Sequence, residues 1–304
     1  WMVLNPSKPS PGRSSLPSGR FGKTMVWDRQ ISLKSEKEVA IMRQAGQINA
    51  EALAAAWAAI RPGASTADLN AAAEEVLKKY GVTSPFKNYP GAYPYPASTT
   101  ISINEELVHG IPNNKRKLKA GDIVSVDCGT TFEGWVADSA FSAPVGEVAP
   151  EVSHLLDVTE RSLYLGISKM LPGNRVGDVS AAIQAFVENE GLHVVREYTG
   201  HGVGRAMHEG PQVPNYGVAG RGMLLRNGMT IALEPMVLMG APATRVQADQ
   251  WTVSAANGRP SAHFEHTIAI TEQGPRILTL LADGKAPVGK LRDLSALPLT
   301  EQKH

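Results

Sequence analysis

The sequence repeats one pattern: Ile60-Arg61-Pro62-Gly63 leads into Asp68-Leu69, Ala71-Ala72, Val76-Leu77 and Gly81-Val82, and Met170-Leu171-Pro172-Gly173 leads into Asp178-Val179, Ala181-Ala182, Phe186-Val187 and Gly191-Leu192. Each matched pair lies 110 residues apart, with no insertion. A Pro-Gly pair marks a turn. A glycine that follows a helical pattern of apolar residues suits the left-handed position that ends a helix. Each copy therefore predicts a helix, a Pro-Gly turn, a second helix and a glycine stop.

Local signals support the helices of the first copy. Ser35 and Glu38 form a Ser-x-x-Glu capping box, which predicts a helix that begins just after Ser35. Glu74 and Lys78 stand four residues apart, a spacing that favours the second helix.

Apolar runs with the form of β-strands follow each copy. There are two in each half, at residues 122–127, 135–141, 229–234 and 263–270. The candidate acids within or at the ends of these runs are Asp127, Asp138, Glu234 and Glu265. The halves match both in their helices and in the places of their acids. This duplication predicts an α+β domain in which helices cover one face of a largely antiparallel sheet.

These four acids are the main chemical signal in the chain. A carboxylate inside an apolar run loses its water, so it needs a partner or takes up a proton. Two divalent cations would supply four positive charges against the four carboxylates and leave a position for a bridging water. The alternative is four unrelated structural acids, and their matching places in the two halves argue against it.

Histidines near these runs are further candidates. His201 and His208 lie among glycines that allow close approach of a ligand, and His201 is a candidate for a neutral imidazole ligand. His109 lies in a loop before the first acid-bearing strand, where a surface turn is the alternative. Carboxylates with one imidazole favour Mn²⁺, Fe²⁺, Co²⁺ or Mg²⁺ over a thiolate-type zinc site.

Bulk composition excludes several classes of protein. The 42% of hydrophobic residues is typical of a globular protein. The 30 basic residues nearly balance the 29 acidic ones, so the chain has no large positive net charge that would attract nucleic acid. The single cysteine, Cys128, fits a reducing cytoplasm and is expected to be a small buried hydrophobe. We expect no membrane span and no secretory signal.

Residues 1–30 and 285–304 are expected to be a flexible arm and a loose tail around a catalytic domain of residues 31–284.

Several motifs occur together in a known order and spacing. They are Asn104-Glu105-Glu106-Leu107-Val108-His109-Gly110-Ile111-Pro112, Val126-Asp127, Asp138, the stretch from Val194 to His208, Leu233-Glu234-Pro235-Met236 and Phe264-Glu265-His266-Thr267. From about Ser35 to Leu280 the sequence resembles the type I methionine aminopeptidases. The resemblance implies the pita-bread fold, with two pseudo-twofold halves and a curved, mainly antiparallel sheet.

The resemblance also implies roles for single residues. The five metal ligands would be Asp127, Asp138, His201, Glu234 and Glu265. Asp138 and Glu265 would bridge two ions, and Glu234 would also accept and shuttle the proton of the attacking water. His109 and His208 would contact the scissile peptide and stabilise the tetrahedral intermediate.

The family's substrate contacts map onto four further positions: Tyr95, Thr100, Met207 and Trp251. Many bacterial members have cysteine where Thr100 stands and phenylalanine where Met207 stands, and residues 86–95 differ in length from the common pattern. The implied substrates are nascent polypeptide N-termini, handled by a cytoplasmic monomer whose N-terminal arm could touch the ribosome.

Two other interpretations stay open at this point. Xaa-Pro aminopeptidases and prolidases share the fold and the ligand pattern, although the compact length and His109-Gly110-Ile111-Pro112 favour the methionine enzyme. A non-catalytic pita-bread binding module is the other, and such proteins typically lose ligands, whereas all five are present here.

Overall fold

The computed structural model describes residues 31–290. The predicted arm, residues 1–30, and residues 291–304 of the predicted tail lie outside this range. Residues 285–290 were expected to belong to the tail, yet Ala286 and Val288 are buried and the Lys290 amide donates a hydrogen bond to Glu160. These residues therefore pack on the domain.

The described residues contain four helices: α1 (Glu36–Ala58), α2 (Thr66–Lys79), α3 (Pro150–Ser168) and α4 (Val176–Asn189). The predicted repeat is confirmed, because α1 and α3 end 110 residues apart and α2 and α4 both begin and end 110 residues apart. Gly63 and Gly173 have φ angles of 86° and 95°, the left-handed conformation that their turns require. The capping box at Ser35 is also confirmed. None of these helices is long and apolar enough to cross a membrane.

The strands of the described residues form four antiparallel sheets. The strands are β1 (Thr99–Ile103), β2 (Glu106–Val108), β3 (Ile123–Phe132), β4 (Trp135–Pro144), β5 (His193–Val194), β6 (Thr199–Gly202), β7 (Glu209–Pro214), β8 (Thr230–Leu233), β9 (Met236–Leu238), β10 (Thr244–Val246), β11 (Val253–Ala255), β12 (Ser261–His263), β13 (His266–Thr271) and β14 (Gly274–Ile277). Their orders are β1-β3-β4, β10-β11-β2, β12-β9-β5 and β14-β13-β8-β6-β7.

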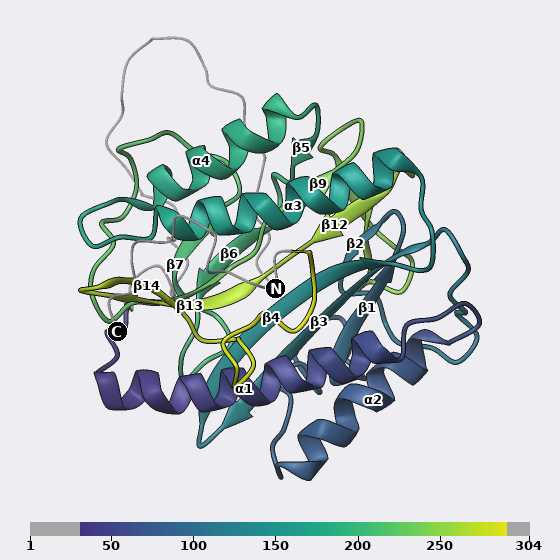
Figure 1. Ribbon diagram of the computed structural model, residues 1–304, viewed down its shortest axis with the longest axis horizontal. Helices are drawn as coiled ribbons and strands as arrows, with labels where there is room; N and C mark the ends of the chain where they lie inside the picture. The colour runs from purple at the N-terminus through teal and green to yellow at the C-terminus, as the bar shows by residue number, and fades with distance from the viewer. Residues whose placement is uncertain (1–30, 291–304) are drawn as a thin grey trace, which may run out of the picture.

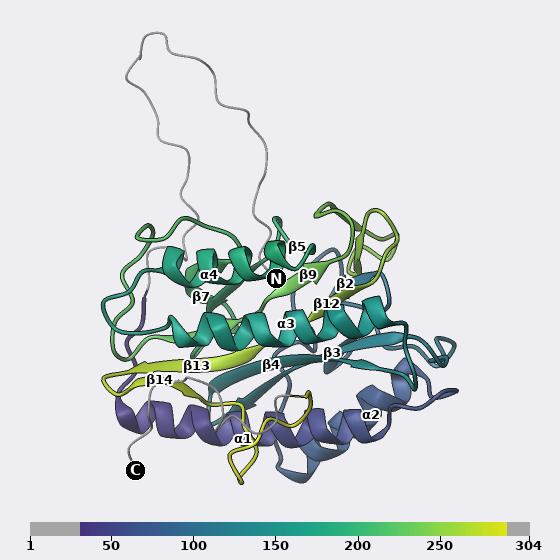
Figure 2. The same ribbon diagram turned by 45° about the horizontal axis from the view of Figure 1, so that its top comes forward.

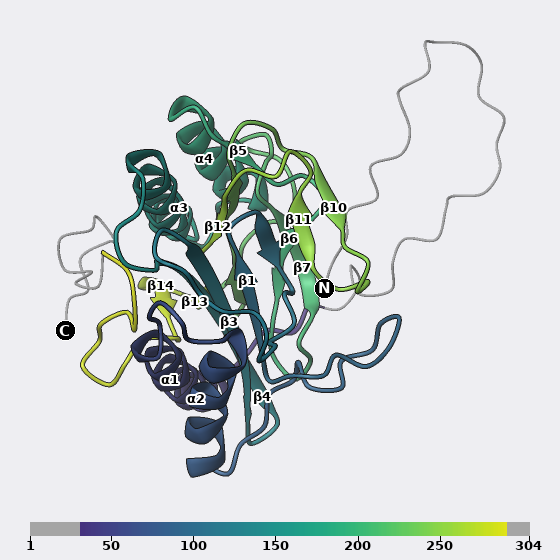
Figure 3. The ribbon, with the colours of Figure 1, turned by 90° about the vertical axis from the view of Figure 1, so that its right-hand side faces the viewer.

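Both helix pairs cover the same side of the strands. Figure 3 shows α1 with α2 and α3 with α4 on one side and most of the strands on the other, with β13 and β14 reaching between the two helix pairs. The main apolar core lies between these layers and includes Leu53 of α1, Leu155 of α3, Val126 of β3 and Ile268 of β13. The predicted α+β architecture, with helices on one face of an antiparallel sheet, is confirmed.

The two halves of the molecule meet where β4 runs beside β13 (Figures 1 and 2). At this seam Ala140 and Glu265 exchange backbone hydrogen bonds of 3.3 and 2.9 Å. The Thr267 hydroxyl also donates to the Asp138 carbonyl and accepts from the Asp138 amide. Strands from opposite halves are thus joined beside two of the predicted acids.

Two of the predicted strands differ in detail from the structure. Residues 263–270 were expected to form one strand, but β12 ends at His263 and β13 begins at His266, so Glu265 lies in a break between strands. The break lets Glu265 pair with β4 of the other half. Residues 122–127 were expected to end at the acid, whereas β3 continues to Phe132 and places Asp127 in mid-strand.

Asn49 of α1 fixes the helix layer to the strands that carry the first two acids. It is fully buried, its amide donates to the Cys128 carbonyl of β3, and its carbonyl accepts a 2.6 Å hydrogen bond from the Ser139 hydroxyl of β4. Cys128 itself is buried in the main core, as expected.

Replacing Asn49 should therefore destabilise the domain. Asn49→Ala leaves a buried carbonyl and a buried hydroxyl without their partner, at about 1–3 kcal/mol for each such group. Urea unfolding followed by circular dichroism measures the loss. Gln44→Ala, at an exposed position of the same helix, is the matched control and should change the unfolding free energy little. Equal effects of the two substitutions would contradict the anchoring role.

Candidate functional site

Three acidic side chains project from the same face of the strands at the seam. Asp127 of β3 lies opposite Ala140 of β4, and Glu265 lies opposite Ala140 on its other side. Residues directly opposite one another in a sheet point to the same face, as do residues two apart on one strand. Asp138, two residues before Ala140, therefore joins Asp127 and Glu265 on that face.

The second half supplies an imidazole and a fourth acid by the same rule. His201 of β6 lies opposite Ala232 of β8, and Glu234 follows Ala232 by two residues. The His201 Nε2 atom lies 3.5 Å from Glu234 Oε1. This pair faces the acids of the first half across the seam.

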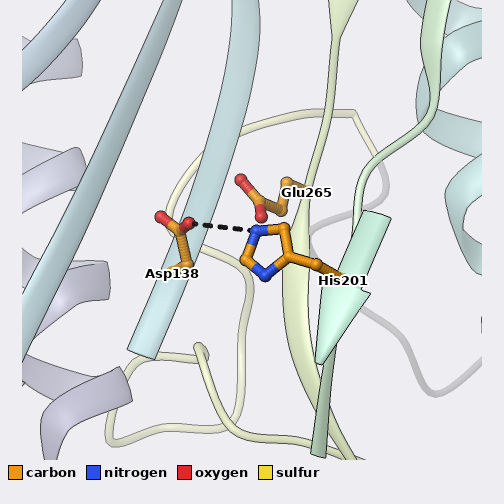
Figure 4. Close-up of side chains that lie close together, drawn as sticks. All are labelled: Asp138, His201 and Glu265. Atoms are coloured by element: carbon orange, nitrogen blue, oxygen red, sulfur yellow. Dashed lines mark ion pairs between the residues drawn. The ribbon is translucent and has the colours of Figure 1, made fainter. Parts of the chain in front are cut away.

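Figure 4 shows His201 turned toward Asp138, with Glu265 beside both. The His201 Nε2 atom lies 4.0 Å from Asp138 Oδ2, and one donor atom from each of Asp138, His201 and Glu265 lies within 4.8 Å of the others. The structure thus brings three of the predicted ligands into one group that could hold a metal ion. Glu234 adjoins it through His201.

Burial raises the pKa of all four carboxyl groups. The pKa of Asp138 rises to about 7. The pKa values of Asp127, Glu234 and Glu265 rise well above their ordinary range because of burial and then because of neighbouring carboxylate charge. Desolvation favours the neutral form of an acid, so these groups hold protons near neutral pH unless a cation replaces them.

The same site has buried polar atoms without hydrogen-bond partners. Within residues 31–290 these include Asp127 Oδ1, Asp138 Oδ1, Glu265 Oε1 and His263 Nε2. In that range no lysine or arginine forms an ion pair with any of the four acids; the ionisable side-chain nitrogen atoms found within 4.0 Å of Asp138, Glu234 and Glu265 belong to His201 and His263. Carboxylate oxygens with imidazole nitrogens are donors that divalent metal ions accept, so this donor set fits a metal centre.

The imidazoles of the site are neutral. Burial lowers the pKa of His201 to about 4 and that of His263 to about 3. It lowers the pKa values of His109 and His208 well below the ordinary range. Neutral imidazole is the form that binds metal, and it can also donate one hydrogen bond.

A small cavity adjoins the acids. It is lined by Val108, His109, Tyr198, Thr199, His201, His208, Glu234 and Met236. His109 follows β2, is 6% exposed and has a φ angle of 64°. The surface-turn alternative for His109 is therefore wrong. His109 and His208 line the same cavity as His201 and Glu234. This placement is what their expected role as substrate contacts beside the metal ligands requires.

The loop that carries His208 is held from two sides. The Tyr89 hydroxyl lies 2.7 Å from His208 Nδ1. On the other side, Glu209 forms a 2.6 Å ion pair with Lys34, and both side chains are largely buried. Sequence reasoning missed Tyr89 and Lys34, because nothing in their local sequence indicates these distant contacts.

An apolar cluster lies next to the cavity. Tyr95, Met207 and Trp251 all belong to it, and the rings of Tyr95 and Trp251 meet edge to face at 5.3 Å. Tyr89 packs against the same cluster and reaches His208, which places the cluster beside the cavity. Thr100 is buried on β1 directly opposite Asp127. The predicted substrate contacts thus surround the site.

The model of metallopeptidase family M24 matches residues 40–272, which include all the predicted ligands. The chain belongs to metallopeptidase family M24. Membership in a metallopeptidase family agrees with the metal-binding donor set described above.

Two methionine aminopeptidases match the chain over most of its length. A methionine aminopeptidase of Clostridium acetobutylicum is 47% identical over 250 residues, which cover 82% of this chain and 99% of the relative. A solved structure of methionine aminopeptidase from Thermotoga maritima matches with a TM-score of 0.80 and 45% identity, over 82% of this chain and 99% of that one. These matches confirm the resemblance found in the sequence and the pita-bread fold that it implies.

Prolidases of the same fold are more distant. The prolidase from Pyrococcus horikoshii matches with a TM-score of 0.65 and 24% identity, covering 82% of this chain but 63% of that one. This likeness shows the shared fold alone. The comparisons therefore favour the methionine aminopeptidase resemblance over the Xaa-Pro alternative.

Proposed function

We propose that the chain removes the N-terminal methionine from proteins and peptides by hydrolysis, with divalent cations held at the seam between its halves. The buried group of Asp138, His201 and Glu265 carries the proposal, because it gathers metal donors beside a cavity and an apolar cluster. Relatives named methionine aminopeptidase that match 82% of the chain support this substrate class.

Two divalent cations would be held by five residues: Asp127, Asp138, His201, Glu234 and Glu265. By family resemblance Asp138 and Glu265 would serve both ions, and the remaining three would serve one ion each. When bound, such cations lower the pKa of coordinated water and polarise a carbonyl group. Carboxylate-rich coordination suits Mn²⁺, Fe²⁺ or Co²⁺, and metal analysis of the purified protein distinguishes them.

Glu234 would hold and return the proton of the attacking water. Its side chain is 13% exposed in the cavity wall, and burial raises its pKa, so it can carry a proton at neutral pH. A carboxyl group whose pKa is raised by burial holds a proton more readily, which a general acid and base requires. Its Oε1 atom lies 3.5 Å from His201 Nε2, which would place the carboxylate beside the cations.

His109 and His208 would bind the scissile peptide. Both are neutral, buried and part of the cavity lining, so each can donate one hydrogen bond. A hydrogen bond to an oxygen that gains negative charge in the transition state lowers the barrier. The Tyr89 contact to Nδ1 orients His208 for this task and leaves its other nitrogen for substrate.

The methionine side chain would enter the apolar cluster that contains Tyr95, Met207 and Trp251, with Thr100 nearby. An unbranched thioether packs well among aromatic rings and other methionines, which favours methionine over charged residues at this position. We further propose that the enzyme acts on nascent N-termini in the cytoplasm as a monomer. Ribosome contact through residues 1–30 stays a prediction.

Cleavage of short peptides tests this function directly. The metal-loaded protein should release methionine from Met-Ala-Ser and should act far more slowly on Ala-Pro-Ser, because the apolar cluster binds a methionine side chain. Liquid chromatography of the products measures both rates. Faster cleavage of Ala-Pro-Ser would favour the Xaa-Pro alternative, and a folded, metal-loaded protein without turnover would favour a binding module.

Substitutions should separate metal binding from turnover. Asp138→Asn or Glu265→Gln removes a charge from the metal donors and should abolish tight binding of two ions. His109→Ala should keep both ions and lower kcat by about 10²-fold, the effect of losing one hydrogen-bond donor to the transition state. Atomic absorption after desalting gives metal content, and Glu75→Gln at an exposed helix position is the control. Unchanged metal content in both acid variants would show that those acids are not ligands of the metal ions.

Metal binding should release protons. The carboxyl groups have raised pKa values and hold protons near pH 7, whereas the imidazoles have lowered pKa values and are already neutral. The cation displaces carboxyl protons, so affinity should rise and proton release should decline as the pH increases. Titration calorimetry in two buffers of different ionisation enthalpy counts the protons. A binding heat that is the same in both buffers at pH 7 would contradict the raised pKa values.

A further inference from the structure

One buried imidazole at the site was absent from the sequence-based assignment. His263 ends β12, two residues before Glu265, and its side chain is 2% exposed. Its Nε2 atom has no hydrogen-bond partner among the described residues. A buried polar atom without a partner is costly, so the position of this nitrogen requires an explanation.

The distances around His263 match those around His201. Its Nε2 atom lies 3.7 Å from Glu234 Oε2 and 3.9 Å from Glu265 Oε2. The corresponding distances from His201 Nε2 are 3.5 Å to Glu234 and 4.0 Å to Asp138. The distances from His263 are too long for hydrogen bonds. Two donors that each bind one cation at about 2.0–2.2 Å lie up to about 4 Å apart, so the spacing is typical of ligands to a shared ion.

Glu234 lies between the two imidazoles. It turns Oε1 toward His201 and Oε2 toward His263. His263 therefore lies at the other oxygen of this carboxylate, where Glu265 also presents an oxygen. The donors around His263 are the same kinds of atom as those around His201.

We infer that His263 is a further ligand of the metal centre, binding through Nε2 beside Glu234 and Glu265. The inference rests on the proposed function, because it requires that centre to bind metal. A second imidazole makes the donor set softer than five ligands with one imidazole. His263 should therefore favour Co²⁺ over Mn²⁺ at this centre.

The backbone holds His263 in place independently of its ring. The Ser142 hydroxyl of β4 accepts a 2.8 Å hydrogen bond from the His263 amide and donates a 3.0 Å bond to the His263 carbonyl. The backbone also pairs with Met236 of β9. Substitution of the ring should thus leave these backbone hydrogen bonds intact, which makes a metal-binding test of the variant feasible.

Titration calorimetry on the metal-free protein provides the first test. His263→Gln and His263→Ala should each weaken Co²⁺ binding at least about tenfold and weaken Mn²⁺ binding less. His154→Gln, which removes an exposed imidazole that pairs with Glu190 on the surface, is the control and should bind both ions as the parent protein does. Unchanged Co²⁺ affinity in both His263 variants, beside normal binding by the parent, would overturn the inference alone. A parent protein that binds no Co²⁺ would overturn the proposed function as well.

Proton NMR of the protein loaded with Co²⁺ provides a second test, which detects coordination by each imidazole directly. Ring protons of a coordinated imidazole are shifted far outside the normal spectral range by the unpaired electrons. Signals from two histidines are expected, and one set should vanish in His263→Gln. Signals from a single histidine, or two sets that both persist in His263→Gln, would show that His263 is not a ligand.

Discussion

The structure depends on the neutralisation of four acids that lie together at the seam between its halves. Asp127, Asp138 and Glu265 are buried and Glu234 is 13% exposed, and in residues 31–290 no lysine or arginine forms an ion pair with any of the four. Such an arrangement is stable only if protons or cations neutralise the carboxylates. Cation binding and the integrity of the seam are therefore expected to be thermodynamically linked.

Duplication explains how the chain assembles such a site. Each half contributes a helix pair and strands with acids, but neither half holds a complete set of donors. The hydrogen bonds between Ala140 and Glu265, together with those between Asp138 and Thr267, bring the sets together. The donors thus converge only after the halves have packed, so the proposed chemistry requires tertiary structure from both.

Most of the fold and the acids of the site could be predicted because both depend on local sequence pattern. The 110-residue repeat fixed the helices, and an acid within an apolar run marked each strand of interest. The break at Glu265 could not be predicted, because the run from His263 to Ile270 has no glycine or proline and the break follows from pairing with β4. Lys34 was missed for a similar reason, since its partner Glu209 lies 175 residues away.

Burial of the second-half histidines could serve both cation binding and hydrogen bonding to the substrate. Dehydration keeps His201, His208 and His263 neutral, and only neutral imidazole can coordinate a cation through nitrogen. The same dehydration strengthens any hydrogen bond from His208 to a charged oxygen. Tyr89 and the Lys34–Glu209 pair restrain the His208 loop against the apolar cluster. A substrate end bound in that cluster would therefore meet donors whose positions are already fixed, which lowers the entropy cost of reaching the transition state.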